Sequence, residues 1–280
     1  MLGITTVGGN VGLRETTRNA LRVLALLGRT DVPVAAGAAA PLIRPLEIAD
    51  DVHGESGLDG ADLPEPASDV RPEGALAFLR ATLEAAPAPV TLIPTGPLTN
   101  IALFLAMHPD VAQKVDRIVL MGGAYGEGNV TPAAEFNIWV DPEAAARVFE
   151  SGLDVTMIGL DVSHQAIFGP EPTARIKGAG RVGAMVAELL EFYGRFHKQS
   201  YGWDGSPIHD AVAMAHAFRP GLVETVRVGV KVDCDDGLGR GRTNCDLRGR
   251  VGWEPNAQVG VGIDADAFIE LLVERISSLG

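Results

Sequence analysis

The sequence predicts an α/β protein built on an open, mostly parallel sheet that is flanked by helices. Short apolar runs typical of buried strands alternate along the chain with amphipathic stretches typical of helices, an order that favours a parallel sheet covered by helices. The 280 residues are 46% apolar and 21% charged, the composition of an ordinary globular protein. Because no internal repeat or clear linker interrupts the pattern, a single domain over residues 1–280 is expected.

The individual elements follow from local composition. Strands are expected where aliphatic residues run together, and helices where apolar residues recur every three or four positions. The predicted strands are residues 2–7, 32–36, 90–94, 117–121 and 155–160, with a strand-rich part at 225–262. The predicted helices are residues 15–27, 76–85, a segment ending near 107, 142–150, 181–200, 208–218 and 267–279. This succession is that of a Rossmann-like sheet.

The connections differ in composition from these elements. Residues 37–74 are rich in Pro, Gly and Asp and are expected to form a long excursion, a kind of loop that is usually functional or mobile. Residues 164–180 are predicted to form a Pro/Gly-rich connection. By contrast, the helix at 142–150 has a strong start, with Asp141 as its cap and Pro142 at its first position.

The charge balance and the apolar runs exclude several classes of partner. Lys and Arg number 23 against 36 Asp and Glu, and no basic run occurs, so no nucleic-acid partner is expected. The longest apolar run, residues 101–107, is far shorter than the ~20 residues that span a bilayer. No signal peptide is recognised at the start. Cys234 and Cys245 favour a reduced, cytoplasmic protein, although a disulfide between paired strands stays open.

The most informative segment is residues 121–137, MGGAYGEGNVTPAAEFN. It leaves the carboxyl end of a predicted strand, which is where open α/β sheets bind ligands. It carries Met121, Asn129, Glu135 and Asn137 but no lysine, which suits neutral hydroxyl groups better than phosphate. Each residue alone is explained as part of a loop, but together the amides and the carboxylate favour a hydroxyl-binding cluster. This loop is therefore predicted to bind a sugar.

Polar residues also follow other predicted strands. Asn10 closes the first strand, where it is either a turn residue or an amide that bonds a ligand hydroxyl or orients a nearby carboxylate. Thr95 ends another strand before Gly96 and Pro97. Turn chemistry explains Thr95 fully, but a main-chain carbonyl freed there could also bind a hard cation such as calcium. The sequence does not separate these alternatives.

His209 and Asp210 open a predicted helix, and two interpretations apply to them. In the structural one, Ser206 caps the helix, Pro207 fits its first turn, and Asp210 gains about 0.3–1 kcal/mol from the helix dipole. In the functional one, Asp210 is a cation ligand and His209 gives a proton to a leaving group. Composition alone favours the structural interpretation.

Taken together, these motifs resemble the inosine–uridine-preferring nucleoside hydrolase family. The matching segments are LGITTVGGN at 2–10, HGESGL at 53–58, TGPLTN at 95–100, the loop at 121–137 running into DPEAA at 141–145, and His209-Asp210. The likeness runs from residue 2 nearly to the end, and several motifs in the same order are far more specific than any one. It implies the nucleoside hydrolase fold and hydrolysis of the N-glycosidic bond of purine or pyrimidine ribonucleosides to ribose and free base.

The resemblance also implies roles for individual residues. The Thr95 carbonyl and the Asp210 carboxylate would bind calcium, His53 would lie near the base, and His209 would protonate the departing base. The residues that would hold the ribose are Asn10, Met121, Asn129, Glu135 and Asn137. Positive charge builds on the ribose ring as the bond breaks, so nearby oxygen atoms stabilise the transition state. The family further implies nucleoside salvage, and a homodimer or homotetramer.

One family motif has no counterpart in residues 1–280. The family begins with a strand followed by D-x-D-P-G-x-D-D, whose aspartates supply calcium ligands and the general base, and no such motif occurs here. The expectation is that the chain is N-terminally truncated, lacks its first strand, and would take its remaining calcium ligands from the missing segment. The alternatives are a non-catalytic nucleoside or ribose binder and an inactive fragment.

Base preference is left open by the sequence. It would depend on the segments around residues 53–74 and 192–204. The aromatic side chains that could cover the base, or simply pack a helix, are Phe192, Tyr193, Phe196, Tyr201 and Trp203.

Overall fold

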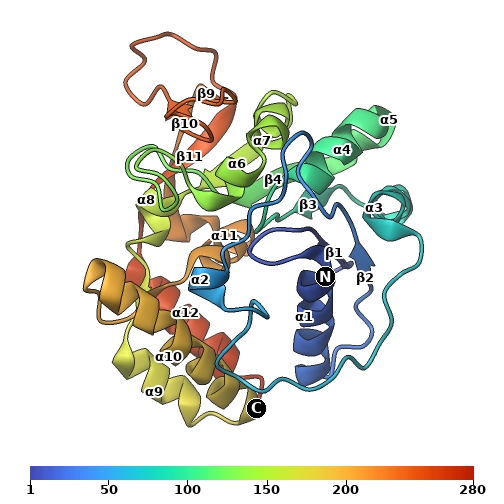
Figure 1. Ribbon diagram of the computed structural model, residues 1–280. Coiled ribbons are helices and arrows are strands. Elements are labelled where there is room, and N and C mark those ends of the chain that lie inside the picture. The colour runs from blue at the N-terminus through green and yellow to red at the C-terminus, as the bar shows by residue number, and fades with distance from the viewer.

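A five-stranded sheet forms the centre of the protein in this computed structural model, with the strand order β3-β4-β5-β11-β8 (Figure 1). The strands are β3 (Val90–Leu92), β4 (Val115–Met121), β5 (Val155–Ile158), β11 (Ala257–Ile263) and β8 (Val223–Val228). Four of them run parallel, and β8 lies antiparallel to β11 at one edge. The structure describes residues 1–50 and 52–280, and only the helical backbone at residue 51. The predicted α/β class with a mostly parallel sheet is confirmed.

Three further strand pairs lie outside this sheet. β1 (Ile4–Thr6) pairs in parallel with β2 (Val34–Ala36), while the pairs β6 (Ile167–Phe168) with β7 (Ser206–Pro207) and β9 (Val230–Val232) with β10 (Thr243–Cys245) are antiparallel. The side-chain amide of Asn100, on α4 (Thr99–Met107), helps to connect the β1–β2 pair to the rest of the protein. The Nδ2 atom of Asn100 donates to the Thr6 carbonyl at 2.8 Å, and its Oδ1 accepts from Ala38 N at 2.9 Å. This link holds the end of β1 near the main sheet.

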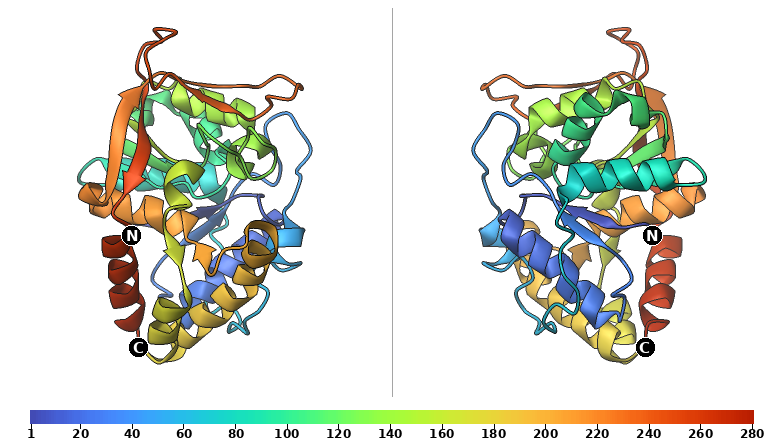
Figure 2. Two further views of the ribbon diagram at one scale, coloured as in Figure 1. Left: turned by 90° about the vertical axis from the view of Figure 1, so that its left-hand side faces the viewer. Right: turned by 90° about the vertical axis from the view of Figure 1, so that its right-hand side faces the viewer.

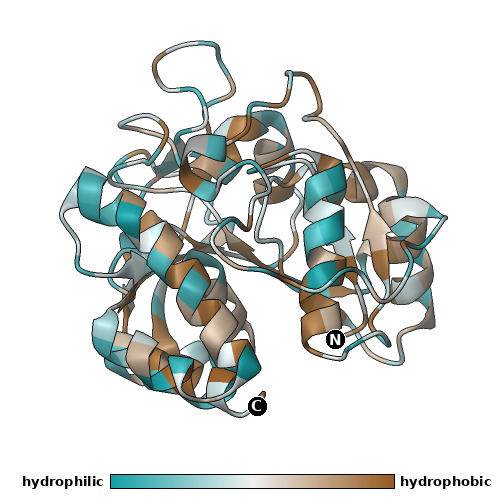
Figure 3. Cartoon of the chain, turned by 60° about the horizontal axis from the view of Figure 1, so that its bottom comes forward, coloured by the Kyte–Doolittle hydropathy of each residue, from teal (hydrophilic) through white to brown (hydrophobic). Residues whose placement is uncertain are grey.

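Helices cover both faces of the main sheet. The helices of the protein are α1 (Leu13–Leu26), α2 (Asp50–His53), α3 (Gly74–Ala85), α4 (Thr99–Met107), α5 (Pro109–Ala112), α6 (Phe136–Val140), α7 (Pro142–Phe149), α8 (Leu160–Ser163), α9 (Pro170–Lys177), α10 (Arg181–Tyr201), α11 (His209–Phe218) and α12 (Ala265–Ser277). Helices α3, α4 and α7 lie on one face, and α11 and α12 on the other. A 3-10 turn, η1, spans Pro220–Leu222. Helices α9, α10 and α12 pack on one another, and Figure 2 shows this group below the sheet from two sides. Figure 3 shows hydrophilic and hydrophobic residues mixed along these helices, as expected where only one side meets the core.

Alternation along β4 explains why the sheet is buried on both sides. Ile118 and Leu120 belong to a core cluster with residues of α3, α4 and α7, whereas Val119 and Met121 belong to a second cluster with residues of α11 and α12. All of them are at most 3% exposed. A parallel strand covered on both faces carries a continuous apolar run rather than an alternating one, as this strand does.

The structure corrects two expectations about local structure. Residues 164–180 are not only a connection, because they contain α9, which begins at Pro170. Proline fits the first helical position, where its missing N–H has no partner in any case. Ser206 and Pro207 do not start a helix either. They form β7, and α11 begins at His209 after Ile208, without a side-chain cap. The predicted cap at Asp141 is confirmed, since its carboxylate accepts from Ala144 N at 3.1 Å.

The two cysteines are free thiols, so the disulfide alternative is wrong. The register explains this, because Cys245 on β10 lies opposite Val230, whereas Cys234 follows the end of β9. Their positions on the hairpin therefore differ by several residues. Within the described part of the chain, we find no helix with the length and hydrophobicity to cross a membrane.

Candidate active site

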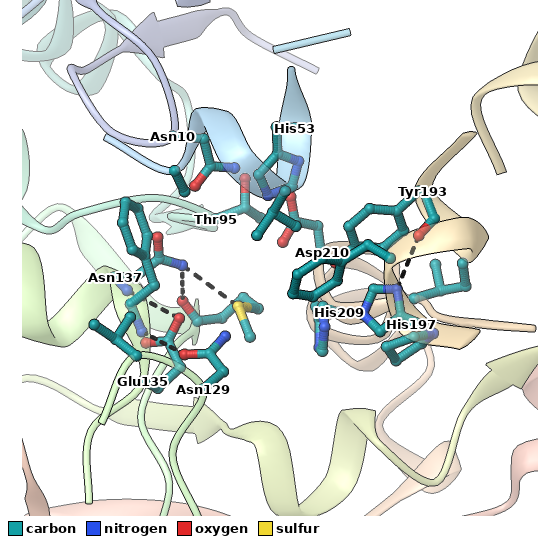
Figure 4. Close-up of a pocket in the computed structure, with 18 of the residues that line it drawn as sticks. Asn10, His53, Thr95, Asn129, Glu135, Asn137, Tyr193, His197, His209 and Asp210 are labelled. Carbon is teal, nitrogen blue, oxygen red and sulfur yellow. Dashed lines mark hydrogen bonds between the residues drawn. The ribbon is translucent and has the colours of Figure 1, made fainter. Parts of the chain in front are cut away.

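A cavity of about 620 Å³ lies beside the carboxyl ends of β3 and β4. Segments far apart in the sequence meet around it: the turn after β1, α2, the strand ends, the loop 121–137, His164 after α8, α10 and the start of α11 (Figure 4). Every site residue predicted from the sequence lines this cavity. They are Asn10, His53, Thr95, Met121, Asn129, Glu135, Asn137, His209 and Asp210.

Glu135 is the anchor of the loop that follows β4. It is 2% exposed and caps α6, with Oε1 accepting from Asn137 N at 2.9 Å and Oε2 accepting from Gly123 N at 2.8 Å and Ile138 N at 3.2 Å. Burial raises the pKa of this carboxyl, while the N–H groups act in the opposite direction. Because a carboxylate offers about four acceptor positions, it can fix the loop and still accept from a ligand hydroxyl.

Two amides beside Glu135 present opposite hydrogen-bonding groups to the cavity. Asn137 donates from Nδ2 to the carbonyl of Met121 at 3.1 Å and to its sulfur at 3.4 Å, so its Oδ1 remains to accept. Asn129 accepts from Phe136 N at 2.9 Å through Oδ1, so its Nδ2 remains to donate. An acceptor and a donor held side by side suit neighbouring hydroxyl groups, which both donate and accept.

Rings from several elements form the opposite side of the cavity. His53 of α2 stacks on Tyr193 of α10 with ring centroids 5.4 Å apart, and Tyr193 meets His197 edge-on at 4.3 Å. Trp203, which does not itself line the cavity, supports these rings by stacking on His197 at 5.9 Å and on Tyr201 at 4.6 Å. Burial raises the pKa of Tyr193 well above its usual value, so this phenol stays neutral. We call this group of rings the aromatic wall.

His209 lies between the aromatic wall and the sheet, in the first turn of α11. Its Nδ1 is 2.7 Å from the hydroxyl of Ser163. Burial first, and then the neighbouring imidazoles of His164, His197 and His53, lower the pKa of His209 to about 3. The ring is therefore neutral near pH 7, and it can act on a ligand as a hydrogen-bond donor or acceptor.

Asp210 follows directly in the same helical turn and faces the cavity near Thr95 (Figure 4). Its side chain is exposed within the cavity, where the surrounding protein leaves it only partly hydrated. This desolvation, together with the charge of Glu135, raises the pKa of Asp210 to about 7. A carboxyl in this state favours a cation or a hydrogen-bond acceptor as its neighbour.

Calcium is the ion that the sequence predicted for this site. Its two predicted ligands, the Asp210 carboxylate and the Thr95 carbonyl, both line the cavity. However, calcium takes six to eight oxygen ligands, and the described residues contain no group of three or more His, Cys, Asp or Glu side chains that could hold a metal ion. The described residues therefore do not by themselves fit a calcium ion.

Some residues of the site were not predicted from the sequence. Ser163 and His164 lie where the chain leaves β5, at the same edge of the sheet as the predicted residues. Their position after a buried strand is the signal that could have identified them. His197, in contrast, reaches the cavity from the C-terminal part of α10, and no local motif marks it.

The fold and the cavity define a class of protein: an α/β protein whose sheet carries, at its carboxyl edge, a cavity lined by amide, carboxylate and imidazole side chains. The family model described as inosine-uridine preferring nucleoside hydrolase matches residues 1–270. The pyrimidine-specific ribonucleoside hydrolase RihA of Citrobacter koseri is 49% identical over 276 residues, which are 98% of this chain and 88% of the relative. RihA of Escherichia coli is 48% identical over 275 residues, with the same coverage.

Solved structures agree with these relatives. The purine-preferring ribonucleoside hydrolase from Gardnerella vaginalis is 34% identical with a TM-score of 0.93, covering 100% of this chain and 90% of that one. A plant nucleoside hydrolase is 32% identical with a TM-score of 0.90, covering 99% and 91%. The chain belongs to the inosine-uridine preferring nucleoside hydrolase family. The relatives and the structures support hydrolysis of the nucleoside N-glycosidic bond as its activity.

Proposed function

We propose that this protein hydrolyses pyrimidine ribonucleosides, such as uridine and cytidine, to ribose and the free base. The pyrimidine preference is supported by the RihA relatives at 49% and 48% identity, which are closer in sequence than the purine-preferring structure at 34%. The observation that carries the proposal is the meeting of all the predicted site residues around one cavity. Nucleoside salvage is the proposed role.

The two sides of the cavity suit the two halves of a nucleoside. The ribose is proposed to lie against Asn10, Asn129, Glu135 and Asn137, whose amides and carboxylate match its hydroxyls. The carboxylate of Glu135 stabilises the positive charge that develops on the ribose ring as the bond breaks. The base is proposed to lie against the aromatic wall, where His209 donates a hydrogen bond to the negative charge that develops on it.

Steady-state kinetics with residues 1–280 tests the proposal. Hydrolysis of uridine and cytidine with a higher kcat/KM than inosine and guanosine is expected. A higher kcat/KM for the purines would contradict the pyrimidine preference but not the reaction. Hydrolysis of none of them would contradict the reaction for this chain.

A second candidate is a nucleoside or ribose binder without turnover. It is favoured by the small number of carboxylates in the cavity, because a general base typically contributes 10²- to 10⁴-fold to such a reaction. Calorimetry with uridine and with ribose, coupled to an assay for released base, separates the candidates. Heat of binding without base release identifies the binder.

We further propose that the hydrolase activity depends on calcium. The resemblance to the family supports this. The chemistry of Asp210 and of the Thr95 carbonyl, both hard oxygen donors, agrees with it. Calcium titration of the chain by calorimetry, with Asp210→Asn as the matched variant, tests it. Weak binding that is lost in the variant supports the ligand role of Asp210, and unchanged binding contradicts it.

The proposal also covers the oligomeric state and the cellular compartment. A homodimer or homotetramer is proposed from the family resemblance, and light scattering during size-exclusion chromatography tests it. A cytoplasmic protein is proposed because both cysteines are free, which agrees with a reducing compartment. Cell fractionation tests this directly.

A further inference from the structure

Ser163 connects the end of β5 to the ring of His209. It is the last residue of α8 and is fully buried. Its Oγ lies 2.7 Å from His209 Nδ1 and 3.1 Å from the carbonyl oxygen of Gly159, four residues earlier. The hydroxyl carries a single proton, so it can donate to only one of these two acceptors.

The carbonyl of Gly159 already has its donors. It accepts from Val162 N at 3.2 Å and from Ser163 N at 3.1 Å, which uses both lone pairs of a carbonyl oxygen. In addition, the 3.1 Å separation is longer than the usual 2.5–3.0 Å for an O–H···O bond. The hydroxyl proton is therefore directed to Nδ1 of His209, at the shorter distance.

This choice fixes the tautomer of His209. A neutral imidazole carries its proton on one nitrogen only, and the nitrogen that accepts a hydrogen bond is the one without it. With Nδ1 accepting from Ser163, the proton sits on Nε2, the nitrogen left to meet a ligand in the cavity. The opposite arrangement would present a lone pair to the leaving base and repel its developing negative charge.

We infer that Ser163 is a positioning residue that holds His209 in the Nε2–H tautomer, so that the ring donates a hydrogen bond to the leaving base. The inference rests on the proposed function for the role of that hydrogen bond. Its geometric part, the tautomer, stands on Ser163, Gly159 and His209 alone.

The backbone around Ser163 is held in place by the ligand-binding loop. Leu160 N donates to the Gly123 carbonyl at 2.9 Å. A Cβ atom at position 159 would lie only 2.6 Å from that same carbonyl oxygen, so the close approach requires glycine. Since Gly123 N in turn donates to Glu135 at 2.8 Å, the loop that faces the ribose and the hydroxyl that orients His209 share one anchor.

The tautomer is tested directly by nitrogen NMR. The chain is labelled with ¹⁵N-histidine, and the two-bond ¹⁵N–¹H correlations identify which ring nitrogen is protonated. The chain has six histidines, and His209→Gln assigns the signal. An Nε2–H pattern for His209 is expected in the wild type, with a mixture of tautomers in Ser163→Ala. An Nδ1–H pattern in the wild type overturns the inference, whether or not the chain is active.

Kinetics test the consequence for the reaction. Ser163→Ala is expected to lower kcat for uridine about ten- to a hundredfold, a part of what general acid–base groups contribute, with KM changed less than about threefold. 4-Nitrophenyl riboside, whose leaving group needs no donor, should lose less than about threefold. Ser163→Thr keeps the hydroxyl and should restore uridine hydrolysis.

A matched control is available in α9. Thr173 also bonds through its hydroxyl to the carbonyl of a glycine four residues earlier, Gly169, at 2.7 Å, but it does not line the active cavity. Thr173→Ala should leave both substrates unchanged. Equal losses on both substrates in Ser163→Ala, or no loss on uridine, overturn the inference. If the wild type hydrolyses neither substrate, the proposed function fails, and the NMR result still decides the tautomer.

Discussion

The two sides of the active cavity are built in opposite ways. The proposed ribose side comes mainly from one continuous segment, residues 121–137, whose polar side chains are fixed by hydrogen bonds to its own backbone. The base side comes from α2, α8, α10 and α11, and its rings are held mostly by contact with one another. The comparison teaches that the proposed ribose side depends on hydrogen bonds within one loop, whereas the proposed base side depends on packing between several helices.

The largest effect is expected on the ribose side, at Glu135. Glu135→Gln keeps most of the shape but removes the negative charge beside the developing cation, so kcat/KM for uridine should fall about 10²- to 10³-fold. Glu127→Gln, on the exposed part of the same loop, is the matched control and should change little. A loss of less than about threefold in Glu135→Gln would show that the carboxylate only shapes the loop.

The next effect is expected at the junction of the two sides, at His209. His209→Ala should reduce kcat for uridine about 100-fold, because the base then leaves without a hydrogen-bond donor. The loss on 4-nitrophenyl riboside should be much smaller, since nitrophenolate is a good leaving group. Comparable losses on the two substrates would exclude a leaving-group role for His209.

A smaller effect is expected within the aromatic wall. Tyr193→Leu removes the ring that stacks on His53 and meets His197. Stacking and edge contacts contribute about 0.5–1.5 kcal/mol each, so KM for uridine should rise about three- to tenfold with little change in kcat. Tyr193→Phe keeps the ring and should stay within about twofold of the wild type. A change confined to kcat would contradict a binding role for the wall.

The smallest effect is expected on the pH dependence of the unfolding free energy. The two sides of the cavity should differ in this property as well. Burial lowers the pKa of His164 below its ordinary value of 6.5. A histidine with a lowered folded-state pKa binds its proton better when unfolded. Its contribution to stability is therefore complete above pH 6.5 and is lost as the pH falls below that value. Because histidines of this kind lie on the proposed base side, this side should lose stability first as the pH falls.

His164→Gln should reduce the loss of unfolding free energy between pH 7.5 and pH 5, because the variant has no imidazole to protonate. Denaturant titrations at the two pH values measure this difference. His108→Gln, which lies outside the cavity, provides the comparison. An equal pH dependence in the wild type and His164→Gln would show that His164 is not a source of acid sensitivity.

Much of the ribose side could be predicted because its signals are local. Met121, Asn129, Glu135 and Asn137 follow one buried strand in a single glycine-rich loop, and the structure brings all of them to the cavity. Asn10 and Thr95 were found by the same reasoning, since the carboxyl ends of neighbouring parallel strands meet at one edge of a sheet. The roles of these residues in binding ribose remain predictions.

The sequence missed features that depend on distant contacts. The connection at 164–180 contains α9, whose first residue is Pro170. Composition alone did not distinguish a proline that begins a helix from a proline in a turn. Ser206 had the composition of a helix cap, but pairing with Phe168 placed it in a strand. In each case a local preference of a few tenths of a kcal/mol to about 1 kcal/mol was outweighed by tertiary packing.

By itself, the sequence determined the α/β class, the buried strand that leads into the glycine-rich loop, and the polar residues at the strand ends. These depend on hydrophobic periodicity and on turn chemistry, which act between residues close in the chain. Only the tertiary structure decided which rings form the aromatic wall and which hydroxyl meets His209. Such contacts join elements separated by many residues. The sequence around one residue therefore does not indicate which distant residue it will contact.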